Sequence, residues 1–439
     1  MIEGGALERY LMTKLLDWKN SRRKKPIIIN GARQVGKTWL LKEFGARYFD
    51  NIAYVNFDNN TAMALLFEEN YDISHLLTGI QAETGERITE GKTLIIFDEI
   101  QECPKALTSL KYFRENAPGQ VIAAAGSLLG LSVHHGTGYP VGNVATLDLY
   151  PLNFREFLDA TNNGSLRELI DTDDHSTLAA FSARFIPLLR QYYFTGGMPE
   201  VVAAFVDSGV LEDAREVQRQ ILADYRRDIS KHLTAFETER ALAVWDSIPA
   251  HLGQENRKFI FGHIKESARA KDYRAAITWL TEAGLTYRVR RVSKPGIPFA
   301  AYADESAFKL FALDVGLLAA LSGLDSGSVI NGNKVFTEFK GALTEQFVCQ
   351  QLISDCRLQP FYWSADNSRG EIDFLVQNES RIYPIEVKAE ENLRSKSLRA
   401  FSEKYTGMSP RRFSLSGYRD EGWMCNVPLF AIGNIKGWG

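Results

Sequence analysis

Residues 26–42 read PIIINGARQVGKTWLLK and contain the pattern G-x-x-x-x-G-K-[ST] between an apolar run and a segment with helical spacing. The pattern needs this strand-then-helix context, in which glycines let backbone N–H groups close around phosphate oxygens. Lys37 offers a point charge to the phosphates, and Thr38 offers a hydroxyl to a magnesium ion. The stretch therefore predicts a Walker A loop. Its phosphate-binding residues would be Gly31, Ala32, Arg33, Gln34, Val35, Gly36, Lys37 and Thr38.

Two acids end a second apolar run, LIIFDE, at residues 94–99. The run is typical of a Walker B strand whose first acid, Asp98, holds magnesium. Glu99 is the expected general base, because a carboxylate beside the metal can orient or deprotonate the attacking water. Ser127 follows another apolar run and is expected to hydrogen-bond the γ-phosphate or that water. We therefore predict catalysis by Lys37, Glu99 and Ser127, with magnesium on Thr38 and Asp98.

The spacing of apolar residues predicts the fold class. Over the first 150 residues, short β-branched runs alternate with amphipathic segments, which is typical of a parallel sheet covered by helices. The expected strands are residues 26–30, 52–56, 93–98, 121–125 and 145–149. From about residue 150 to 245 the spacing becomes helical, and from residue 341 a helix is again followed by strands. The Gly-, Ser- and Asn-rich stretch 322–333 is the expected domain boundary.

The composition excludes several classes of protein. The 439 residues include 51 Lys and Arg and 54 Asp and Glu, so any nucleic-acid site must be local. No stretch approaches the roughly 18 apolar residues of a membrane helix, and residues 1–14 lack the regions of a secretory signal. We expect a cytoplasmic protein without a membrane partner. Four scattered cysteines without a C-x-x-C pair indicate neither a disulfide framework nor a zinc site.

A local basic excess lies between residues 256 and 294, where ten Lys and Arg face three acids. The expected order is a helix, a turn, a second helix at 273–283, Gly284 and a strand at 285–292. This order is typical of a winged helix. Such a domain binds DNA phosphates or contacts other proteins, and both interpretations stay open.

Near the C-terminus, EIDFLV at residues 371–376 and YPIEVK at 383–388 predict two strands, with Glu386 and Lys388 on one face. The pair resembles the D…E-x-K core of the PD-(D/E)XK nuclease superfamily. The resemblance implies that Asp373 and Glu386 ligate a second Mg²⁺ or Mn²⁺ and that Lys388 orients water or stabilises phosphate charge. Glu345 matches the extra acid of some members. A retained fold without nuclease activity has equal weight.

The chain as a whole resembles the P-loop ATPases of the AAA superfamily, in particular prokaryotic AAA ATPases with a C-terminal DUF4143 region. The resemblance rests on residues 31–38, 97–101, 126–127, 150–157, 196–199 and 308–318. It implies that Gly197 and Pro199 form an element that closes a helical lid over adenine. Many relatives carry Gly-Arg where this chain has Gly142 and Asn143. The arginine finger is therefore unassigned, with Arg155, Arg226 and Arg227 as candidates by position.

These patterns together predict an α/β protein with four domains. They are an AAA-type ATPase core (1–155), a helical lid (156–250), a winged-helix-like domain (251–330) and a restriction-endonuclease-like domain (331–439). The first functional hypothesis is a magnesium-dependent ATPase coupled to nucleic-acid binding or cleavage. The alternative is a slow-turnover, ATP-dependent switch that binds a protein or nucleic-acid partner, with an inactive nuclease-like domain. Either reading is compatible with oligomer formation.

Overall fold

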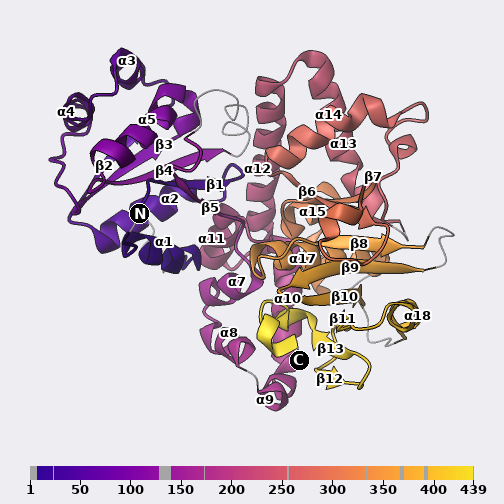
Figure 1. Ribbon diagram of the computed structural model, residues 1–439. Helices are drawn as coiled ribbons and strands as arrows, with labels where there is room; N and C mark the ends of the chain where they lie inside the picture. Colours follow the sequence, from indigo (N-terminus) through magenta and orange to yellow (C-terminus); the bar gives the residue numbers. More distant parts are fainter. Residues whose placement is uncertain are drawn as a thin grey trace. The chain divides into compact units, whose positions relative to one another are not determined.

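The computed structural model describes residues 7–22, 24–127, 140–172, 174–254, 257–331, 334–365, 370–389 and 394–438. These residues divide into two compact units, each with its own sheet (Figure 1). The N-terminal unit consists of Glu8–Tyr150 with Glu282–Gly284. The C-terminal unit consists mainly of Pro151–Thr281 and Leu285–Gly439. Each sheet also has its own hydrophobic core.

The N-terminal unit contains a parallel five-stranded sheet in the order β2-β3-β4-β1-β5. Its strands are β1 (Ile27–Gly31), β2 (Asn51–Asn56), β3 (Thr93–Asp98), β4 (Val121–Ser127) and β5 (Ala145–Asp148). All five agree with the runs predicted from the sequence. Because the strands are parallel, their carboxyl ends share one edge, where Gly31 pairs with Ser127 and Asn56 pairs with Asp98. The predicted phosphate loop, acids and serine therefore meet at this edge.

Helices cover both faces of this sheet, with α1 and α2 on one face and α3, α4 and α5 on the other (Figure 1). The helices are α1 (Leu11–Lys19), α2 (Lys37–Tyr48), α3 (Thr61–Glu69), α4 (Ile73–Thr84), the 3₁₀ helix η1 (Ile100–Glu102) and α5 (Pro104–Asn116). Asn60 and Asp72 cap α3 and α4 by accepting backbone hydrogen bonds. Phe57, Phe67 and Phe97 pack edge to face in the core, with ring centroids 5.5–5.7 Å apart.

The first part of the C-terminal unit is helical, as the sequence predicts. It contains α7 (Phe154–Ala160), α8 (Gly164–Asp171), α9 (His175–Ala180), α10 (Ser182–Thr195), α11 (Pro199–Ser208), α12 (Leu211–His232) and α13 (Ala235–Leu252). Capping boxes start two of these helices: Asn153 with Glu156 at α7, and Thr234 with Glu237 at α13. The role of these helices as a lid stays a prediction.

A mixed eight-stranded sheet forms the rest of the C-terminal unit, in the order β12-β13-β11-β10-β9-β8-β6-β7. Its strands are β6 (Thr286–Val292), β7 (Ala303–Ala312), β8 (Phe361–Ser364), β9 (Glu371–Asn378), β10 (Arg381–Val387), β11 (Arg411–Ser414), β12 (Arg419–Asp420) and β13 (Cys425–Pro428). Its helices are η3 (Phe261–His263), α14 (Ala270–Glu282), η4 (Phe299–Tyr302), α15 (Val315–Leu321), α16 (Ser326–Asn331), α17 (Lys334–Ser354), α18 (Lys396–Lys404), η5 (Leu429–Ala431) and η6 (Ile435–Trp438). Strands β9 and β10 form the predicted antiparallel pair.

The region predicted as a winged helix differs from the expectation in two ways. The helix expected just before the turn is not found in residues 257–269, where only η3 forms. The predicted second helix and strand are present as α14 and β6, but β6 also pairs in parallel with β8. Because β8 satisfies one edge of β6, the hairpin belongs to the large sheet and does not project as a free wing.

Two further findings concern the linker and the membrane. The stretch predicted as a boundary contains a short helix, α16, and lies within the C-terminal unit. Strands before and after this stretch belong to the same eight-stranded sheet, so backbone hydrogen bonds join the segments on its two sides.

Among the helices of the described residues, none is long and apolar enough to cross a membrane.

Candidate functional site

The Walker A loop lies between β1 and α2 and has the backbone shape that its glycines predict. Gln34 and Gly36 have φ values of +64° and +91°. A Cβ atom on Gly31 would clash with the carbonyl oxygen of Leu149, so only glycine fits there. The loop therefore turns its backbone at the N-terminus of α2, where N–H groups lack helical acceptors.

Lys37 is buried, and its Nζ donates to the carbonyl oxygens of Gly31 at 3.0 Å and Ala32 at 2.7 Å. Burial lowers the pKa of Lys37 to about 8, although the nearby charges of Glu99 and Asp98 raise it. The ammonium has neutral acceptors here and can exchange them for an anion. The site therefore favours binding of a negatively charged group.

Asp98 ends β3, and two hydroxyl groups hold its Oδ2 atom. Thr38 Oγ1 donates to it at 2.7 Å, and the hydroxyl of Tyr54 donates at 2.8 Å. Burial and the hydrogen bond to Asp98 raise the pKa of Tyr54, so the phenol stays protonated. Thr38 and Asp98 are thus brought together as a hydroxyl and a carboxylate suited to Mg²⁺. Tyr54 was not singled out from the sequence, and its place in a β-strand offers no signal for this contact.

Glu99 adopts a left-handed conformation, with φ at +50°, directly after β3. Gln101 donates from Nε2 to Glu99 Oε2 at 2.5 Å and accepts a hydrogen bond from the Ser127 N–H at 3.3 Å. Gln101 is buried, so one amide joins the acid to the end of β4. Gln101 therefore links Glu99 to Ser127, and both residues belong to the predicted catalytic site. Gln101 belongs to the segment 97–101 that carries the family resemblance. A glutamine side chain at this position did not by itself predict a role in the site.

Arg9 is a further residue that sequence reasoning missed. It is buried, and its guanidinium donates to Val35 O at 3.1 Å and to Tyr150 O at 2.6 Å. An arginine before the first helix would ordinarily be assigned to the surface. In this unit it ties the phosphate loop to the segment that follows β5.

Gly197 lies in the turn between α10 and α11, and Pro199 is the first residue of α11, inside the C-terminal unit. The Gly197 N–H donates to Asp314 Oδ2 at 2.7 Å, and the Leu152 N–H donates to Gly197 O at 2.6 Å. A Cβ on Gly197 would clash with Leu152, so the close approach requires glycine. This turn is held by one backbone hydrogen bond and by the carboxylate of Asp314, and the contact of Pro199 with adenine stays a prediction.

The three arginines considered as fingers all form ion pairs in the described structure. Arg155 pairs with Asp355 and Asp171, Arg226 with Asp246, and Arg227 with Asp224. The carboxylates raise the pKa of Arg155 despite the opposing effect of burial. These contacts do not select a finger among them.

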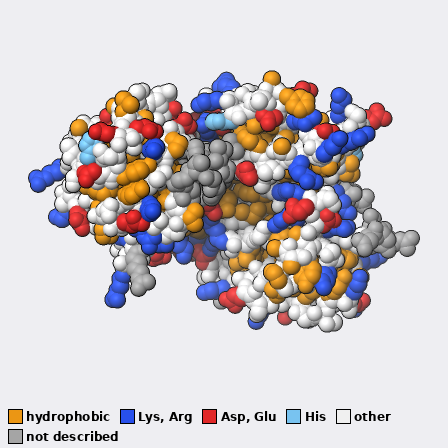
Figure 2. Space-filling view, turned by 45° about the horizontal axis from the view of Figure 1, so that its top comes forward, with side chains coloured by type: hydrophobic (Ala, Val, Ile, Leu, Met, Phe, Trp, Pro, Cys, Tyr) orange, Lys and Arg blue, Asp and Glu red, His pale blue; other side chains and the backbone are white. Residues whose placement is uncertain are grey.

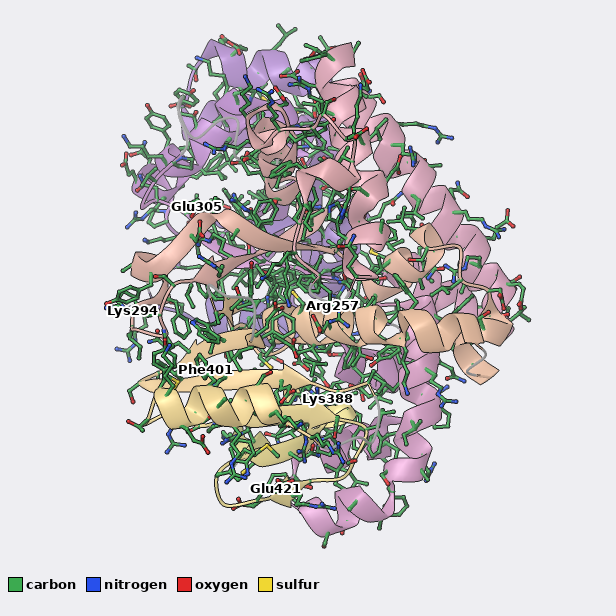
Figure 3. The ribbon with its side chains drawn as sticks, turned by 90° about the vertical axis from the view of Figure 1, so that its right-hand side faces the viewer. Arg257, Lys294, Glu305, Lys388, Phe401 and Glu421 are labelled. Atoms are coloured by element: carbon green, nitrogen blue, oxygen red, sulfur yellow. The ribbon has the colours of Figure 1, made fainter. Side chains whose placement is uncertain are left out.

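Three acids of the C-terminal unit lie in a charge cluster, called here the C-terminal charge cluster, which contains Glu345, Glu371 and Asp373 together with Arg257, Lys258 and Lys309. Glu386 and Lys388 form an ion pair of their own. Arg257 reaches Glu345 at 2.6 Å. Lys309 lies between Glu371, at 2.7 Å, and Glu345, at 3.5 Å. Arg257 lies nearer the centre of Figure 3 than Glu305 and Lys294 of the hairpin region.

The remaining two predicted acids are also engaged. Asp373 Oδ2 accepts a hydrogen bond from the Val387 N–H at 2.8 Å, and Glu386 Oε1 pairs with Lys388 Nζ at 2.8 Å. Glu386 Oε2 is buried and accepts no hydrogen bond from the described residues. No group of three or more His, Cys, Asp and Glu side chains in the described residues is arranged to hold a metal ion. Lys309, from the strand before α15, was the member that the sequence motif did not reveal.

The basic excess of residues 256–294 is partly neutralised. Arg288 and Arg290 pair with Glu305, and Arg291 pairs with Asp304. Five other basic side chains are exposed and form no ion pair within the described part of the chain: Lys265, Arg269, Lys271, Arg274 and Lys294. Figure 2 shows Lys and Arg side chains gathered on the right-hand part of the molecule.

Comparison with known families matches three regions of the chain. The family model described as "AAA domain" matches residues 23–158, which include both Walker segments. Models described as domains of unknown function match residues 186–328 (DUF8612) and residues 340–421 (DUF4143). The expected AAA domain and DUF4143 region are therefore confirmed. No curated protein sequence matches the chain.

Several solved structures are similar to this chain at low sequence identity. The Walker-type ATPase PABY2304 of Pyrococcus abyssi is 12% identical, with 72% of this chain and 96% of that chain covered and a TM-score of 0.44. The ORC1 protein of Aeropyrum pernix, in complex with DNA, is 16% identical, with 71% and 90% covered and a TM-score of 0.27. The RuvB Holliday junction branch migration motor of Thermotoga maritima is 15% identical, with 64% and 90% covered and a TM-score of 0.30.

Proposed function

We propose that this chain, an AAA-domain protein with a DUF4143 region toward its C-terminus, is a magnesium-dependent ATPase that acts as a switch for a macromolecular partner. One observation supports the ATPase more than any other. Lys37, bound to neutral carbonyls, lies in the loop next to the hydrogen-bonded pair of Thr38 and Asp98. An ammonium and a magnesium-binding pair at one strand edge are what a nucleoside triphosphate requires.

Phosphate binding is assigned to the loop from Gly31 to Thr38. Its backbone N–H groups and Lys37 would hold the β- and γ-phosphates, and Lys37 would exchange its carbonyl contacts for phosphate oxygens. Arg9 would keep the loop in shape through Val35. Pro199 is proposed as an adenine contact on the family resemblance alone.

Thr38 and Asp98 would hold the magnesium ion, which when bound supplies charge neutralisation at the β- and γ-phosphate oxygens. The hydroxyl of Thr38 would release its hydrogen bond to Asp98 and turn its oxygen to the cation. Tyr54 would remain on Asp98 and fix the carboxylate.

Glu99 would accept the proton of the attacking water, and Gln101 would hold the carboxylate in position. The electrostatic effect of Glu99 on Lys37 supports a carboxylate turned toward the phosphate loop. Through its second hydrogen bond Gln101 would also align Ser127 with the same site. Gln101 is thus a positioning residue, whereas Glu99 and Ser127 would contact the reacting groups.

The decisive test is phosphate release from ATP by the full-length protein, with and without Mg²⁺, and with GTP as a control nucleotide. We expect turnover that requires Mg²⁺ and is lost in Lys37→Ala. Tight ATP binding with turnover below about one event per hour would favour the slow switch over an active ATPase. Absence of ATP binding in the presence of Mg²⁺ would refute both.

A second observation favours DNA as the partner of the switch. The four exposed basic side chains around the start of α14 are available to phosphates, whereas Arg288, Arg290 and Arg291 already face Glu305 and Asp304. Binding should weaken steeply with salt, because each neutralised phosphate contributes about 0.9 to the logarithmic slope.

The matched variants for this second candidate carry the same number of charge reversals and differ in location. One carries Lys265, Arg269, Lys271 and Arg274 changed to Glu, and the control carries Lys14, Lys105, Lys396 and Lys436 changed to Glu at other exposed sites. The first should lower the salt slope by up to about 4. If both variants bind duplex DNA as the parent does, α14 is not the DNA contact, and a protein partner is favoured. A second metal at Asp373 and Glu386 is not included in the proposed function, because no group of three or more His, Cys, Asp and Glu side chains in the described residues is arranged to hold one.

A further inference from the structure

We infer that residues 149–154, called here the connecting segment, transmit the nucleotide state of the phosphate loop to helix α17, and that Tyr192 is the positioning residue that ties the segment to this helix. The inference rests on the proposed ATPase function and adds a route for its regulation. Along the chain, the connecting segment leaves the N-terminal unit at Tyr150 and enters the C-terminal unit at Pro151.

The first two residues of the connecting segment contact the phosphate loop and the strand before it. The carbonyl oxygen of Leu149 lies 2.4 Å from the position that a Cβ atom on Gly31 would take. Arg9 donates to the carbonyl oxygen of Tyr150 at 2.6 Å and to that of Val35 at 3.1 Å. A change in the loop on phosphate binding therefore acts directly on the backbone at the start of the segment.

Tyr192 of α10 binds the connecting segment two residues further on. Its side chain is buried, and its hydroxyl donates to the carbonyl oxygen of Leu152 at 2.5 Å. Burial raises the pKa of Tyr192 well above its ordinary value, so the phenol keeps the proton with which it donates. The same hydroxyl oxygen accepts a hydrogen bond from Gln350 Nε2 at 3.0 Å. One hydroxyl group thus joins the segment to α17.

Helix α17 also binds the connecting segment directly. The Phe154 N–H donates to Gln351 Oε1 at 2.9 Å. The ring of Phe154 packs edge to face against the rings of Tyr192 and Phe347, with centroids 5.6 and 6.0 Å apart. Two neighbouring glutamines of α17 therefore hold the segment, one directly and the other through Tyr192.

The turn before α11 belongs to the same hydrogen-bond network. Asp314 Oδ2 accepts from Gln350 Nε2 at 3.1 Å and from the Gly197 N–H at 2.7 Å, and Gly197 O accepts from the Leu152 N–H. Both backbone groups of Leu152 are thus fixed by buried partners. Because an unpaired buried polar group is costly, a displacement of the segment should shift its partners with it and not break these hydrogen bonds.

The network joins the three regions that the family models match. Leu152 and Phe154 lie in the AAA region 23–158, Tyr192 and Asp314 lie in the region 186–328, and Gln350 lies in the DUF4143 region. The DUF4143 region is therefore connected to the ATP-binding sheet by buried hydrogen bonds as well as by the chain. In the proposed switch, this region receives the nucleotide state through α17.

The test is hydrogen–deuterium exchange of the α17 amides in the full-length protein, measured with ATP and Mg²⁺ and without nucleotide. The parent carries Glu99→Gln so that bound ATP persists during labelling. We expect ATP to slow exchange in residues 341–354 by about fivefold or more, the lower end of ordinary coupling between sites. In Tyr192→Phe, which lacks the hydroxyl but keeps the ring, ATP should still bind and its effect on α17 should disappear. A merely structural role of the hydroxyl would raise exchange with and without ATP alike and leave the effect of ATP in place.

Tyr193→Phe is the matched control, because Tyr193 is buried on the same helix and its hydroxyl contacts Thr344 of α17. It should keep the effect of ATP. An effect that survives in Tyr192→Phe, or that is lost equally in both variants, would overturn the inference. If Tyr192→Phe does not fold, Gln351→Met takes its place, since it removes the acceptor of the Phe154 N–H. Absence of ATP binding would refute the proposed function, whereas ATP binding that leaves exchange in α17 unchanged would refute this inference alone.

Discussion

Lys37 and Lys309 are both buried lysines near acidic side chains, yet their surroundings give them opposite electrostatic properties. Lys37 donates to two carbonyls, and burial lowers its pKa to about 8. Lys309 lies between two carboxylates, and its pKa is raised. A lysine among neutral acceptors gains electrostatic stabilisation when an anion binds, whereas a lysine among carboxylates is already stabilised by them. We call the site of Lys37 open, because its ammonium can bind an anion, and the site of Lys309 closed, because its charge is already paired.

The acids of the two sites differ in the same sense. Asp98 and Glu99 are held by hydroxyl and amide groups, which a cation or water can replace at small cost. Glu345 and Glu371 are held by ammonium and guanidinium groups. Changes at the open site should therefore alter chemistry, and changes at the closed site should alter stability.

The largest expected effect is at Glu99. Glu99→Gln keeps the hydrogen-bonding shape of the side chain but cannot accept a proton, so kcat for ATP should fall by about 10²- to 10⁴-fold. ATP affinity and the Tm should stay close to those of the unmodified protein. Single-turnover assays and equilibrium binding separate the two quantities. An equal loss of ATP affinity and of kcat would indicate that Glu99 contributes to substrate binding and not to proton transfer.

The counterpart at the closed site is Glu345→Gln. Removing one partner of a buried ion pair should lower the free energy of unfolding by about 3 kcal/mol, because Arg257 and Lys309 lose a counter-ion. Denaturant unfolding measures this loss, and ATP turnover at 20 °C should be preserved. The exposed Glu403→Gln in α18 is the control. A variant with normal stability and impaired turnover would mean that the contrast between the two sites is wrong.

Removing the ammonium of the open site should cost binding. Lys37→Ala should weaken ATP binding by about 100-fold, which is the usual scale for losing charged hydrogen bonds. Lys42→Ala is the matched control, since Lys42 is on the same helix but lies over the ring of Tyr54 at 3.7 Å. Calorimetric titration with ATP and Mg²⁺ compares them. Similar losses in both variants would show a general effect of positive charge in α2.

The smallest expected effect is the pH dependence of ATP binding. The pKa of Lys37 is about 8 without bound phosphate, and phosphate charge should raise it in the complex. Binding should therefore be constant below pH 8 and weaken by up to about tenfold per pH unit above it. Lys37→Ala should lose this dependence. A dependence that persists in that variant would assign it to another group.

Much of the open site could be predicted from the sequence because it is local. The glycines, Lys37 and Thr38 lie within eight residues, and the strand before them determines where they point. The acids at 98 and 99 end an apolar strand, and parallel strands bring their carboxyl ends to one edge by geometry alone. The partners Tyr54, Gln101 and Arg9 did not follow, because their side chains reach across the sheet or the loop through tertiary contacts.

The C-terminal motif shows what only the tertiary structure decided. The sequence by itself determined two strands, two acids and a lysine in a nuclease-like order, and β9 and β10 pair as predicted. It did not determine that Lys309, more than sixty residues before Asp373, would reach the carboxylates. Nor did it determine that β6 would join the same sheet and bring Arg257 and Lys309 into one cluster. A motif specifies which charged groups lie along a strand. The net charge around those groups depends on every segment packed against the strand, and these segments come together only in the folded chain.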